Sequence, residues 1–251
     1  MSTKLNGKVA VITASTEGIG LAIAKRLASD GASVVISSRK LKKVTKAVDL
    51  LKKMGYQQVY GCRCHIGVAE DRKNLFRETM SIFGRIDIFV SNAAVNPFLG
   101  KILDCPQQVW DKIFDINVRA PFLMVKDAVP LIKKSQGGSV VFISSVAAYN
   151  PMRKIGAYSV SKTALLGLTK VLSQSLIEDN IRVNCVAPGV VETKSSRTII
   201  AGNKTILEEI PLNRVAAPEE IAAVVSFLVS DDASYVSGET VTVAGGMISH
   251  L

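Results

Sequence analysis

Three residues that can hold or move a proton lie close together in the sequence: Ser145, Tyr158 and Lys162. Tyr158 and Lys162 are four residues apart, so on a helix their side chains share one face, and the ammonium group would favour ionisation of the phenol. Ser145 follows a predicted strand, at the sheet edge where α/β folds bind ligands, and its hydroxyl could hold a substrate oxygen. The spacing predicts acid-base chemistry, although Tyr and Lys four residues apart are also common by chance.

Small residues follow the first apolar run of the chain, between Thr13 and Gly20. They let a ligand approach the backbone, and a helix that begins here offers unpaired N–H groups to a pyrophosphate. The strict Gly-x-Gly-x-x-Gly pattern fails because Ile23 occupies its third glycine position, so a tight strand-to-helix turn is the alternative. The position after the first strand favours a dinucleotide site. The residues predicted to contact the cofactor here are Ala14, Ser15, Thr16, Gly18, Ile19 and Gly20.

The second predicted strand ends in Ser38, Arg39 and Lys40, where a dinucleotide site commonly has an acidic residue for the adenosine ribose. No carboxylate stands at this place in the sequence. A hydroxyl and two cations favour a 2′-phosphate, so the sequence predicts NADPH and NADP+ rather than NADH. The alternative is that Arg39 and Lys40 are solvated residues that open the next helix.

The elements that must position these residues alternate along all 251 residues, as short β-branched runs and helix-like stretches. Strands are predicted over residues 9–13, 34–36, 58–62, 86–90, 140–143, 181–186 and 240–243. Apolar strands joined by long crossovers indicate an α/β fold, a doubly wound, Rossmann-like sheet of seven parallel strands with helices on both faces. No repeat or linker interrupts this alternation, so residues 1–251 are expected to form a single dinucleotide-binding and catalytic domain.

The composition excludes several classes of protein. Hydrophobic residues make up 48% of the chain and charged residues 21%, which is typical of a compact domain. The sequence has no apolar run near the roughly 18–20 residues of a membrane span, and no secretory signal is recognised. The formal charge is +10, but the basic pairs are dispersed and lack interleaved aromatic residues, so specific nucleic-acid binding is not expected. The four cysteines are expected to be reduced thiols.

Two other kinds of site have only partial signals in the sequence. Cys62, Cys64 and His65 could join in a metal site, but on a strand the two thiols face away from the imidazole and no fourth ligand is apparent. No metal site is therefore predicted. A Ser-His-Asp hydrolase is disfavoured because the sequence lacks a Gly-x-Ser-x-Gly turn, and His65 and His250 are its only histidines.

The predicted helix over residues 156–179 is apolar around much of its circumference. Its apolar residues are Ala164, Leu165, Leu166, Leu168, Val171, Leu172 and Leu176. Such a helix needs a second burial partner besides the sheet. The sheet alone could cover it, but outer helices of a doubly wound fold keep one free face, which favours a homo-oligomer.

These motifs together resemble the short-chain dehydrogenase/reductase family, in its single-domain type, over nearly the whole chain. The matching residues occur in order and at the family's separations: Thr13, Gly18-Ile19-Gly20, Asn92-Ala93-Ala94, Asn117, Ser145, Tyr158 with Lys162, Pro188-Gly189 and Thr193. The resemblance implies that Tyr158 protonates a substrate carbonyl that Ser145 polarises. It also implies that Lys162 binds the nicotinamide ribose while lowering the pKa of the phenol, and that Asn117 holds a water linking Lys162 to solvent.

The resemblance assigns further cofactor contacts by position. They are Cys64 and His65 near the adenine, Asn92, Ala93 and Ala94 after the fourth strand, and Pro188, Gly189, Val191 and Thr193 around the nicotinamide carboxamide. The family usually has Asp at the place of His65.

Residues 13–20, 90–97 and 161–170 further resemble a group of NADPH-dependent carbonyl reductases within this family, typically tetrameric and often peroxisomal. The resemblance implies a homotetramer that reduces small-molecule ketones, aldehydes or α-dicarbonyls. Ser249-His250-Leu251 is similar to the Ser-Lys-Leu peroxisomal address, so binding to the peroxisomal import receptor is expected, with a cytoplasmic location as the alternative.

A substrate lid is predicted over residues 194–211, which follow the carboxamide-binding stretch. Its apolar lining would be Ile199, Ile200, Ile206, Leu207 and Ile210. Candidates for further pocket walls are Phe98, Tyr149, Asn150 and Met152, with ordinary packing as the alternative.

Two other functions stay open. A non-catalytic NADPH-binding sensor or scaffold would keep the fold without turnover, but the intact Ser145, Tyr158 and Lys162 argue against it. An NAD-linked alcohol dehydrogenase that acts oxidatively is disfavoured by Arg39.

Overall fold

The computed structural model describes residues 4–194, 196 and 207–247. Within them one parallel sheet has seven strands in the order β3-β2-β1-β4-β5-β6-β7. The strands are β1 (Val9–Ile12), β2 (Ser33–Ser38), β3 (Val59–Arg63), β4 (Ile88–Ser91), β5 (Gly138–Ile143), β6 (Ile181–Pro188) and β7 (Thr240–Val243). The predicted doubly wound, Rossmann-like fold is confirmed.

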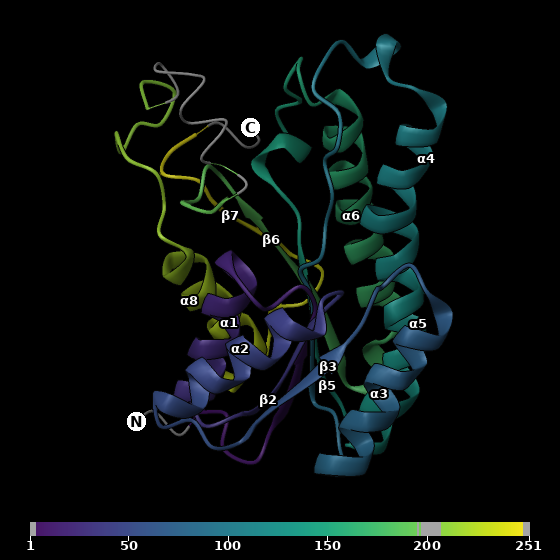
Figure 1. Cartoon of the computed structure of the whole chain (residues 1–251), viewed down its shortest axis with the longest axis vertical. Helices are drawn as coiled ribbons and strands as arrows, with labels where there is room; N and C mark the ends of the chain where they lie inside the picture. Colours follow the sequence, from purple (N-terminus) through teal and green to yellow (C-terminus); the bar gives the residue numbers. More distant parts are fainter. Residues whose placement is uncertain (1–3, 195, 197–206, 248–251) are drawn as a thin grey trace.

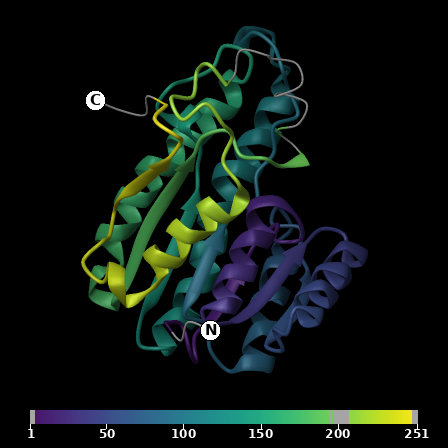
Figure 2. The same ribbon diagram turned by 90° about the vertical axis from the view of Figure 1, so that its left-hand side faces the viewer.

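Helices cover both faces of the sheet. They are α1 (Gly18–Ser29), α2 (Leu41–Lys53), α3 (Ala69–Phe83), α4 (Gln107–Phe114), α5 (Ala120–Lys134), α6 (Gly156–Ser175) and α8 (Pro218–Val229). Figures 1 and 2 show α1, α2 and α8 on one face and α3, α4, α5 and α6 on the other.

The central strands are buried on both sides, which explains their unbroken apolar sequences. All four residues of β1 are buried, with Ala10 and Ile12 packed in the cluster under α1, α2 and α8. Val11 belongs to the opposite cluster, under α3, α5 and α6. Successive strand residues face opposite ways, so both faces of the sheet need apolar residues.

The order of the strands places a topological switch point, called the crevice here, at the carboxyl ends of β1 and β4. From β1 the chain winds outward to β2 and β3, and β4 then begins the other half of the sheet on the far side of β1. Ligands of open α/β sheets bind at such a switch point, outside the carboxyl ends of the strands. The candidate residues of the sequence analysis follow these ends.

Two predictions fall largely outside the described residues. Of the predicted lid lining, Ile199, Ile200 and Ile206 lie outside them, whereas Leu207 is exposed and Ile210 is buried. Residues 249–251 also lie outside the described part of the chain, so the peroxisomal address stays a prediction. No helix among the described residues is long and apolar enough to cross a membrane.

Candidate active site

The turn between β1 and α1 adopts backbone conformations that small residues tolerate. Ala14 has φ 50° and Gly18 has φ 56°, both in the left-handed region. A Cβ at Gly20 would lie 2.5 Å from the Ala14 carbonyl oxygen and 2.6 Å from Asn92 Nδ2. Only glycine fits at this position without a shift, and the turn lies directly against the loop after β4.

Thr13 and Asn92 tie the two loops together. Asn92 Nδ2 donates to the carbonyl oxygens of Thr13 at 3.0 Å and Ala14 at 3.2 Å. The Thr13 hydroxyl in turn accepts from the N–H groups of Asn92 at 2.9 Å and Ala93 at 3.1 Å. Ala94 follows and is exposed. The structure thus brings both predicted cofactor loops to the crevice.

The first turn of α1 is open to an anion. Within the described part of the chain, no side chain caps this turn and it contains no acidic residue. Thr16 and Ile19 flank the opening and are half-buried. The exposed Glu17 carboxylate instead accepts from Lys43 Nζ at 2.9 Å and Lys194 Nζ at 3.3 Å, and the hydrogen bond to Lys43 is the main cause that lowers its pKa. Free N–H groups at a helix N-terminus suit a pyrophosphate.

Ser15 holds β1 to β2 and lies inside the protein. Its hydroxyl donates to the Ile12 carbonyl at 2.7 Å and accepts from the Ser37 N–H at 3.0 Å. The Ser37 hydroxyl donates to the same carbonyl at 3.1 Å. The Ser15 N–H also donates to the Ser37 carbonyl at 3.0 Å, so the polar groups of Ser15 nearest the turn are used within the fold.

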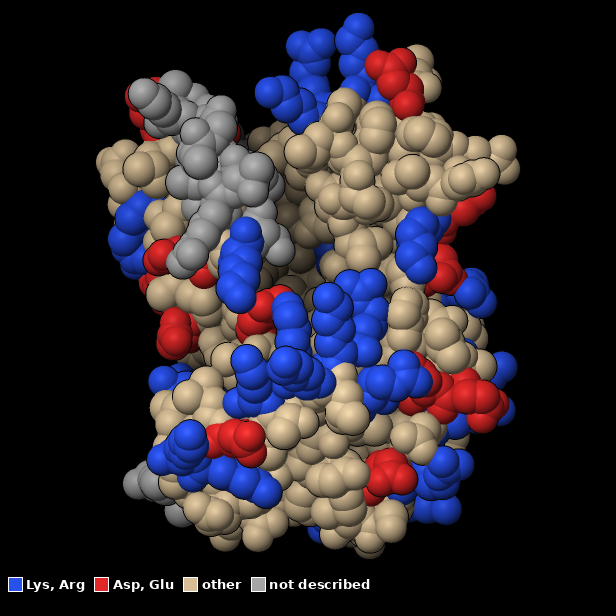
Figure 3. Space-filling view, in the orientation of Figure 1, with Lys and Arg blue, Asp and Glu red and all other residues tan. Residues whose placement is uncertain are grey.

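Ser38, Arg39 and Lys40 lie just beyond this buried link, where β2 meets solvent. Arg39 and Lys40 are exposed, and neither side chain has an ion-pair partner among the described residues. Figure 3 shows Lys and Arg side chains gathered across this face of the molecule, below a hollow. Unpaired cations at this edge fit a phosphate group.

Cys64 and His65 follow β3 at the same edge. The Cys64 N–H donates to the Ser38 carbonyl at 3.0 Å, and burial raises the pKa of the Cys64 thiol to about 12. His65 is half-buried; its N–H donates to Asp71 Oδ2 at 2.8 Å and its Nδ1 accepts from the Gly67 N–H at 3.1 Å. Cys64 is therefore held beside Ser38, and the contact of Cys64 and His65 with an adenine stays a prediction.

The end of β6 lies next to the first turn of α1. β6 ends at Pro188, and a Cβ at Gly189 would lie 2.9 Å from the backbone that follows β7. Val191 is buried. A Cβ at Gly18 would lie 3.3 Å from Thr193 Cγ2, so Thr193 lies against the opening of α1. The predicted carboxamide-binding residues thus border the same crevice.

Ser145, Tyr158 and Lys162 come together at the carboxyl end of β5. Ser145 follows this strand, and its hydroxyl accepts from the Ala147 N–H at 3.2 Å and is hydrogen-bonded to Tyr158. Tyr158 and Lys162 lie on α6, with Lys162 Nζ 5.6 Å from the centre of the Tyr158 ring. The three side chains predicted from the sequence therefore form one cluster.

Burial shifts the pKa values of this cluster. It raises the pKa of Tyr158 to about 12, although the hydrogen bond with Ser145 lowers it. It lowers the pKa of Lys162 to about 8, and Lys162 Nζ donates to the Ile143 carbonyl at 2.7 Å. The sequence predicts that Lys162 lowers the pKa of the phenol, whereas burial dominates here. Tyr158 is consequently a protonated phenol at neutral pH.

Asn117 connects α6 to the loop after β4. It is buried in a π-helical turn, Asp115–Arg119, between α4 and α5. Its Oδ1 accepts from the Val95 N–H at 2.8 Å, and its Nδ2 donates to the Val95 carbonyl at 2.9 Å and to Ser161 Oγ at 3.0 Å. Ser161 Oγ donates to the Tyr158 carbonyl at 2.7 Å. Such π-turns frequently occur at functional sites.

Sequence reasoning did not single out two serines that support the cluster. Ser144 Oγ donates to the Lys162 carbonyl at 2.9 Å, and Ser161 links Asn117 to α6. Each directly precedes a predicted catalytic residue and is buried. Because buried hydroxyl groups need hydrogen-bond partners, a serine next to Ser145 or Lys162 was the available signal.

The predicted pocket walls flank the crevice in two facing loops. Phe98, Tyr149 and Met152 are half-buried, and Asn150 is exposed. The Gly100 N–H donates to the Lys154 carbonyl at 2.9 Å, so the loop after β4 lies against the residues that lead into α6.

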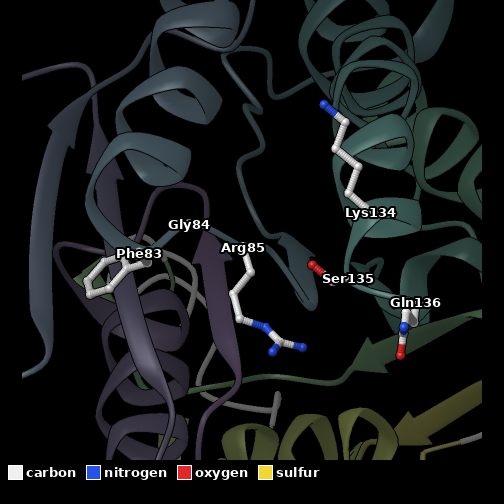
Figure 4. A pocket seen from close by; sticks show the side chains of 6 residues that line it. All are labelled: Phe83, Gly84, Arg85, Lys134, Ser135 and Gln136. Carbon is white, nitrogen blue, oxygen red and sulfur yellow. The ribbon is translucent and has the colours of Figure 1, made fainter.

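Other parts of the molecule offer weaker sites. The described residues contain no group of three or more His, Cys, Asp and Glu side chains placed to hold a metal ion. At the amino-terminal edge of the sheet, a pocket of about 450 Å³ is lined by Phe83, Gly84, Arg85, Lys134, Ser135 and Gln136 (Figure 4). Lys134 points away from Arg85 in this view, and Arg85 is paired with Asp87 at 2.6 Å. The two cations of this pocket therefore do not converge on one point. The pocket lies at the opposite edge of the sheet from Tyr158.

Comparisons with known proteins agree with this geometry. A family described as Enoyl-(Acyl carrier protein) reductase matches residues 13–248. Dehydrogenase/reductase SDR family member 4 of Bos taurus is 53% identical over 250 residues, covering 98% of this chain and 89% of the relative. The protein of the same name from Caenorhabditis elegans is 46% identical over 254 residues, covering 99% and 98%. The chain belongs to the short-chain dehydrogenase/reductase family.

Solved structures of other short-chain dehydrogenases/reductases share the whole fold. A 7α-hydroxysteroid dehydrogenase complexed with NADH and 7-oxo glycochenodeoxycholic acid has a TM-score of 0.93 at 33% identity, covering 100% of this chain and 98% of that one. L-sorbose reductase from Gluconobacter frateurii, complexed with NADPH and L-sorbose, has a TM-score of 0.92 at 32% identity, with both chains fully covered. The predicted family is confirmed, and the chain is an enzyme of this family. The group within it that residues 13–20, 90–97 and 161–170 resemble is Dehydrogenase/reductase SDR family member 4, and this resemblance is confirmed as well.

Proposed function

We propose that this short-chain dehydrogenase/reductase is an NADPH-dependent carbonyl reductase that transfers hydride to ketones, aldehydes or α-dicarbonyls, with Tyr158 as proton donor. The observation that carries the proposal is the half-buried Tyr158, whose phenol is hydrogen-bonded to Ser145 and lies next to Lys162. The two similar solved structures, which hold NADH with a 7-oxo compound and NADPH with L-sorbose, support this class of reaction.

The residues around the crevice fit a nicotinamide dinucleotide. The first turn of α1, which no described side chain caps, can take the pyrophosphate. Ser38 and the exposed Arg39 and Lys40 can take the 2′-phosphate that distinguishes NADPH. The loops after β3, β4 and β6 complete the site on the adenine and nicotinamide sides. When bound, the cofactor supplies a hydride from C4 of its nicotinamide ring.

The chain's own residues then handle the proton and the charge. The hydroxyls of Ser145 and Tyr158 donate hydrogen bonds to the carbonyl oxygen, and Tyr158 gives its proton to that oxygen as the carbonyl carbon is reduced. Lys162, as an ammonium beside the ring, stabilises the phenolate that remains and binds the nicotinamide ribose. Asn117 holds the water through which Lys162 exchanges protons with solvent, and Ser161 ties this residue to α6.

Tyr158→Phe tests the proposal because it removes the proton donor and keeps the ring. We expect kcat for NADPH-dependent reduction of a vicinal diketone or an aromatic ketone to fall by about 10²–10⁴-fold. The Kd of NADPH, measured by fluorescence, should change little. Tyr56→Phe, a half-buried tyrosine outside the cluster, should behave like the unmodified protein. An unmodified protein that binds NADPH but reduces no carbonyl of the panel would instead favour a sensor or scaffold.

We also propose that the enzyme is a homotetramer, which two separate apolar faces support. On α6, Val160 and Val171 are 42% and 53% exposed and continue one helical stripe through Ala164 and Leu168. In the other layer, Phe227 of α8 is 43% exposed. Two self-complementary faces on one subunit generate a closed assembly of four.

A further inference from the structure

We propose that Asn96 is a specificity-determining residue that hydrogen-bonds a hydroxyl group next to the reacting carbonyl, so that the enzyme prefers α-hydroxy carbonyl compounds. The inference rests on the proposed reductase function and names the substrate class of the same site. It starts from an unpartnered polar atom in the loop after β4.

Asn96 Oδ1 is buried and has no hydrogen-bond partner in the part of the chain that the structure describes. Among the described residues, one other buried side-chain oxygen or nitrogen is in this position, Thr242 Oγ1 in β7. Buried polar atoms of folded proteins are nearly always paired, so an unpaired one requires an explanation. Asn96 as a whole is half-buried, so part of this residue borders the surface of the molecule while Oδ1 does not. A ligand that enters from that surface can supply the missing donor.

The position of Asn96 is fixed from the side of the catalytic helix. The preceding residue, Val95, has its N–H and its carbonyl both bonded to the Asn117 side chain, at 2.8 Å and 2.9 Å. The same Asn117 side chain reaches Ser161, which is bonded to the Tyr158 carbonyl. Asn96 is thus one residue away from a continuous chain of hydrogen bonds that ends at Tyr158.

The other end of the loop is fixed to the segment that leads into α6. The Gly100 N–H donates to the Lys154 carbonyl at 2.9 Å, and a Cβ at Gly156 would lie 3.0 Å from Ile102 Cβ. Residues 96–100 therefore lie between the Asn117 contact and the start of the Tyr158 helix. A carbonyl compound held by Tyr158 has this loop as a neighbour.

The chemistry of Asn96 Oδ1 determines which substrate group it can bind. The carbonyl oxygen that reacts already receives the hydroxyls of Ser145 and Tyr158. An amide oxygen is an acceptor, so it calls for a second, donating group, and a hydroxyl on the adjacent carbon supplies one. A site built to bond a substrate hydroxyl discriminates strongly against an analogue that lacks it, because its own polar atom is then left unpaired.

A matched pair of substrates tests this role. 3-Hydroxybutan-2-one and 3-methylbutan-2-one have nearly the same shape and differ in one hydroxyl. Because the hydroxyl also makes the carbonyl more reactive, the decisive quantity is the ratio of the two kcat/KM values and its change on substitution. We expect Asn96→Leu to lower this ratio by about tenfold or more, through loss of the hydroxy ketone. Asn96→Asp, which keeps an acceptor oxygen, should retain more of the ratio than Asn96→Leu does.

Controls separate this role from a structural one. Gln108→Leu, an exposed amide in α4, should leave the ratio unchanged. If Asn96→Leu lowers both kcat/KM values equally, Asn96 only shapes the loop, and the proposal is overturned. If the variant weakens NADPH binding without substrate and keeps the ratio, the amide contacts the cofactor, which overturns it as well. Failure of the unmodified protein to reduce either ketone would contradict the reductase function itself, whereas turnover with a constant ratio contradicts only the role of Asn96.

Discussion

Lys162 makes the activity sensitive to pH. Burial holds its pKa at about 8, and the neighbouring Tyr158 needs the ammonium to stabilise the phenolate. At lower pH the lysine is charged; as pH rises through about 8 it loses its proton, so we expect kcat for reduction to fall. The measurement is kcat against pH at saturating NADPH. A kcat that stays constant across this range would show that the charge of Lys162 is not required.

Arg39 should set the cofactor preference. Arg39→Asp replaces an exposed cation by an anion at the predicted 2′-phosphate position, so we expect KM for NADPH to rise by about tenfold or more and KM for NADH to change far less. Lys53→Asp, an equivalent charge change at the other end of α2, should have little effect on either. Equal losses with both cofactors would refute the phosphate assignment.

Single residues show where sequence reasoning succeeds and where it stops. The spacing of Tyr158 and Lys162 was enough to predict one catalytic face, because helix periodicity is local. The pKa of Tyr158 was not predictable in this way, because it depends on burial under residues distant in the chain. Ser15 was predicted to contact the cofactor from its place in the turn, but its bonds to Ile12 and Ser37 required the register of two strands.

Among the elements, the turn between β1 and α1 has the tightest steric requirement in the site. Gly20→Ala places a methyl group within 2.6 Å of both Ala14 and Asn92, so we expect a loss of about 1–3 kcal/mol of stability and weaker NADPH binding. Gly167→Ala, in α6, is the control. A Cβ at this position would have no atom of the described residues within 4 Å, apart from the backbone of the helix itself. It should stabilise the helix by about 0.5–1 kcal/mol. Denaturant unfolding measures the free energy of unfolding of each variant, and titration with NADPH measures its affinity for the cofactor. If Gly20→Ala were as stable as Gly167→Ala, the packing argument would be contradicted.

The elements themselves were largely predictable from apolar runs, because both faces of the sheet are buried. The residues at which helices and strands end were less predictable. The helix predicted over residues 156–179 ends at Ser175 and continues as a 3-10 turn, Ile177–Asp179, because Asn180 adopts φ 56° to lead into β6. The open amide of Asn96 depends on how the loop after β4 packs against α6, which no local pattern in the sequence encodes.

At the scale of the whole molecule, the apolar stripe of α6 should hold subunits together. Val171→Asp places a charge in its exposed part, so we expect the proposed tetramer to dissociate to smaller species. Light scattering coupled to gel filtration measures the mass, and Gln174→Asp, at an exposed position of the same helix, is the control for charge alone. A tetramer that survives the change at Val171 would place the interface elsewhere.

At the end of β2, the residues that connect the strands differ from those proposed to bind the nucleotide, and this has a consequence for protein engineering. Ser15 and Ser37 connect β1 to β2 inside the protein, whereas Ser38, which follows them, is half-buried and Arg39 and Lys40 are exposed. The groups that secure the sheet and the groups proposed to select the nucleotide are therefore neighbours in sequence but independent in contacts. We therefore expect that the side chains of residues 38–40 can be exchanged together to redirect the proposed NADPH preference towards NADH, while the backbone pairing of Ser38 with β3 is kept.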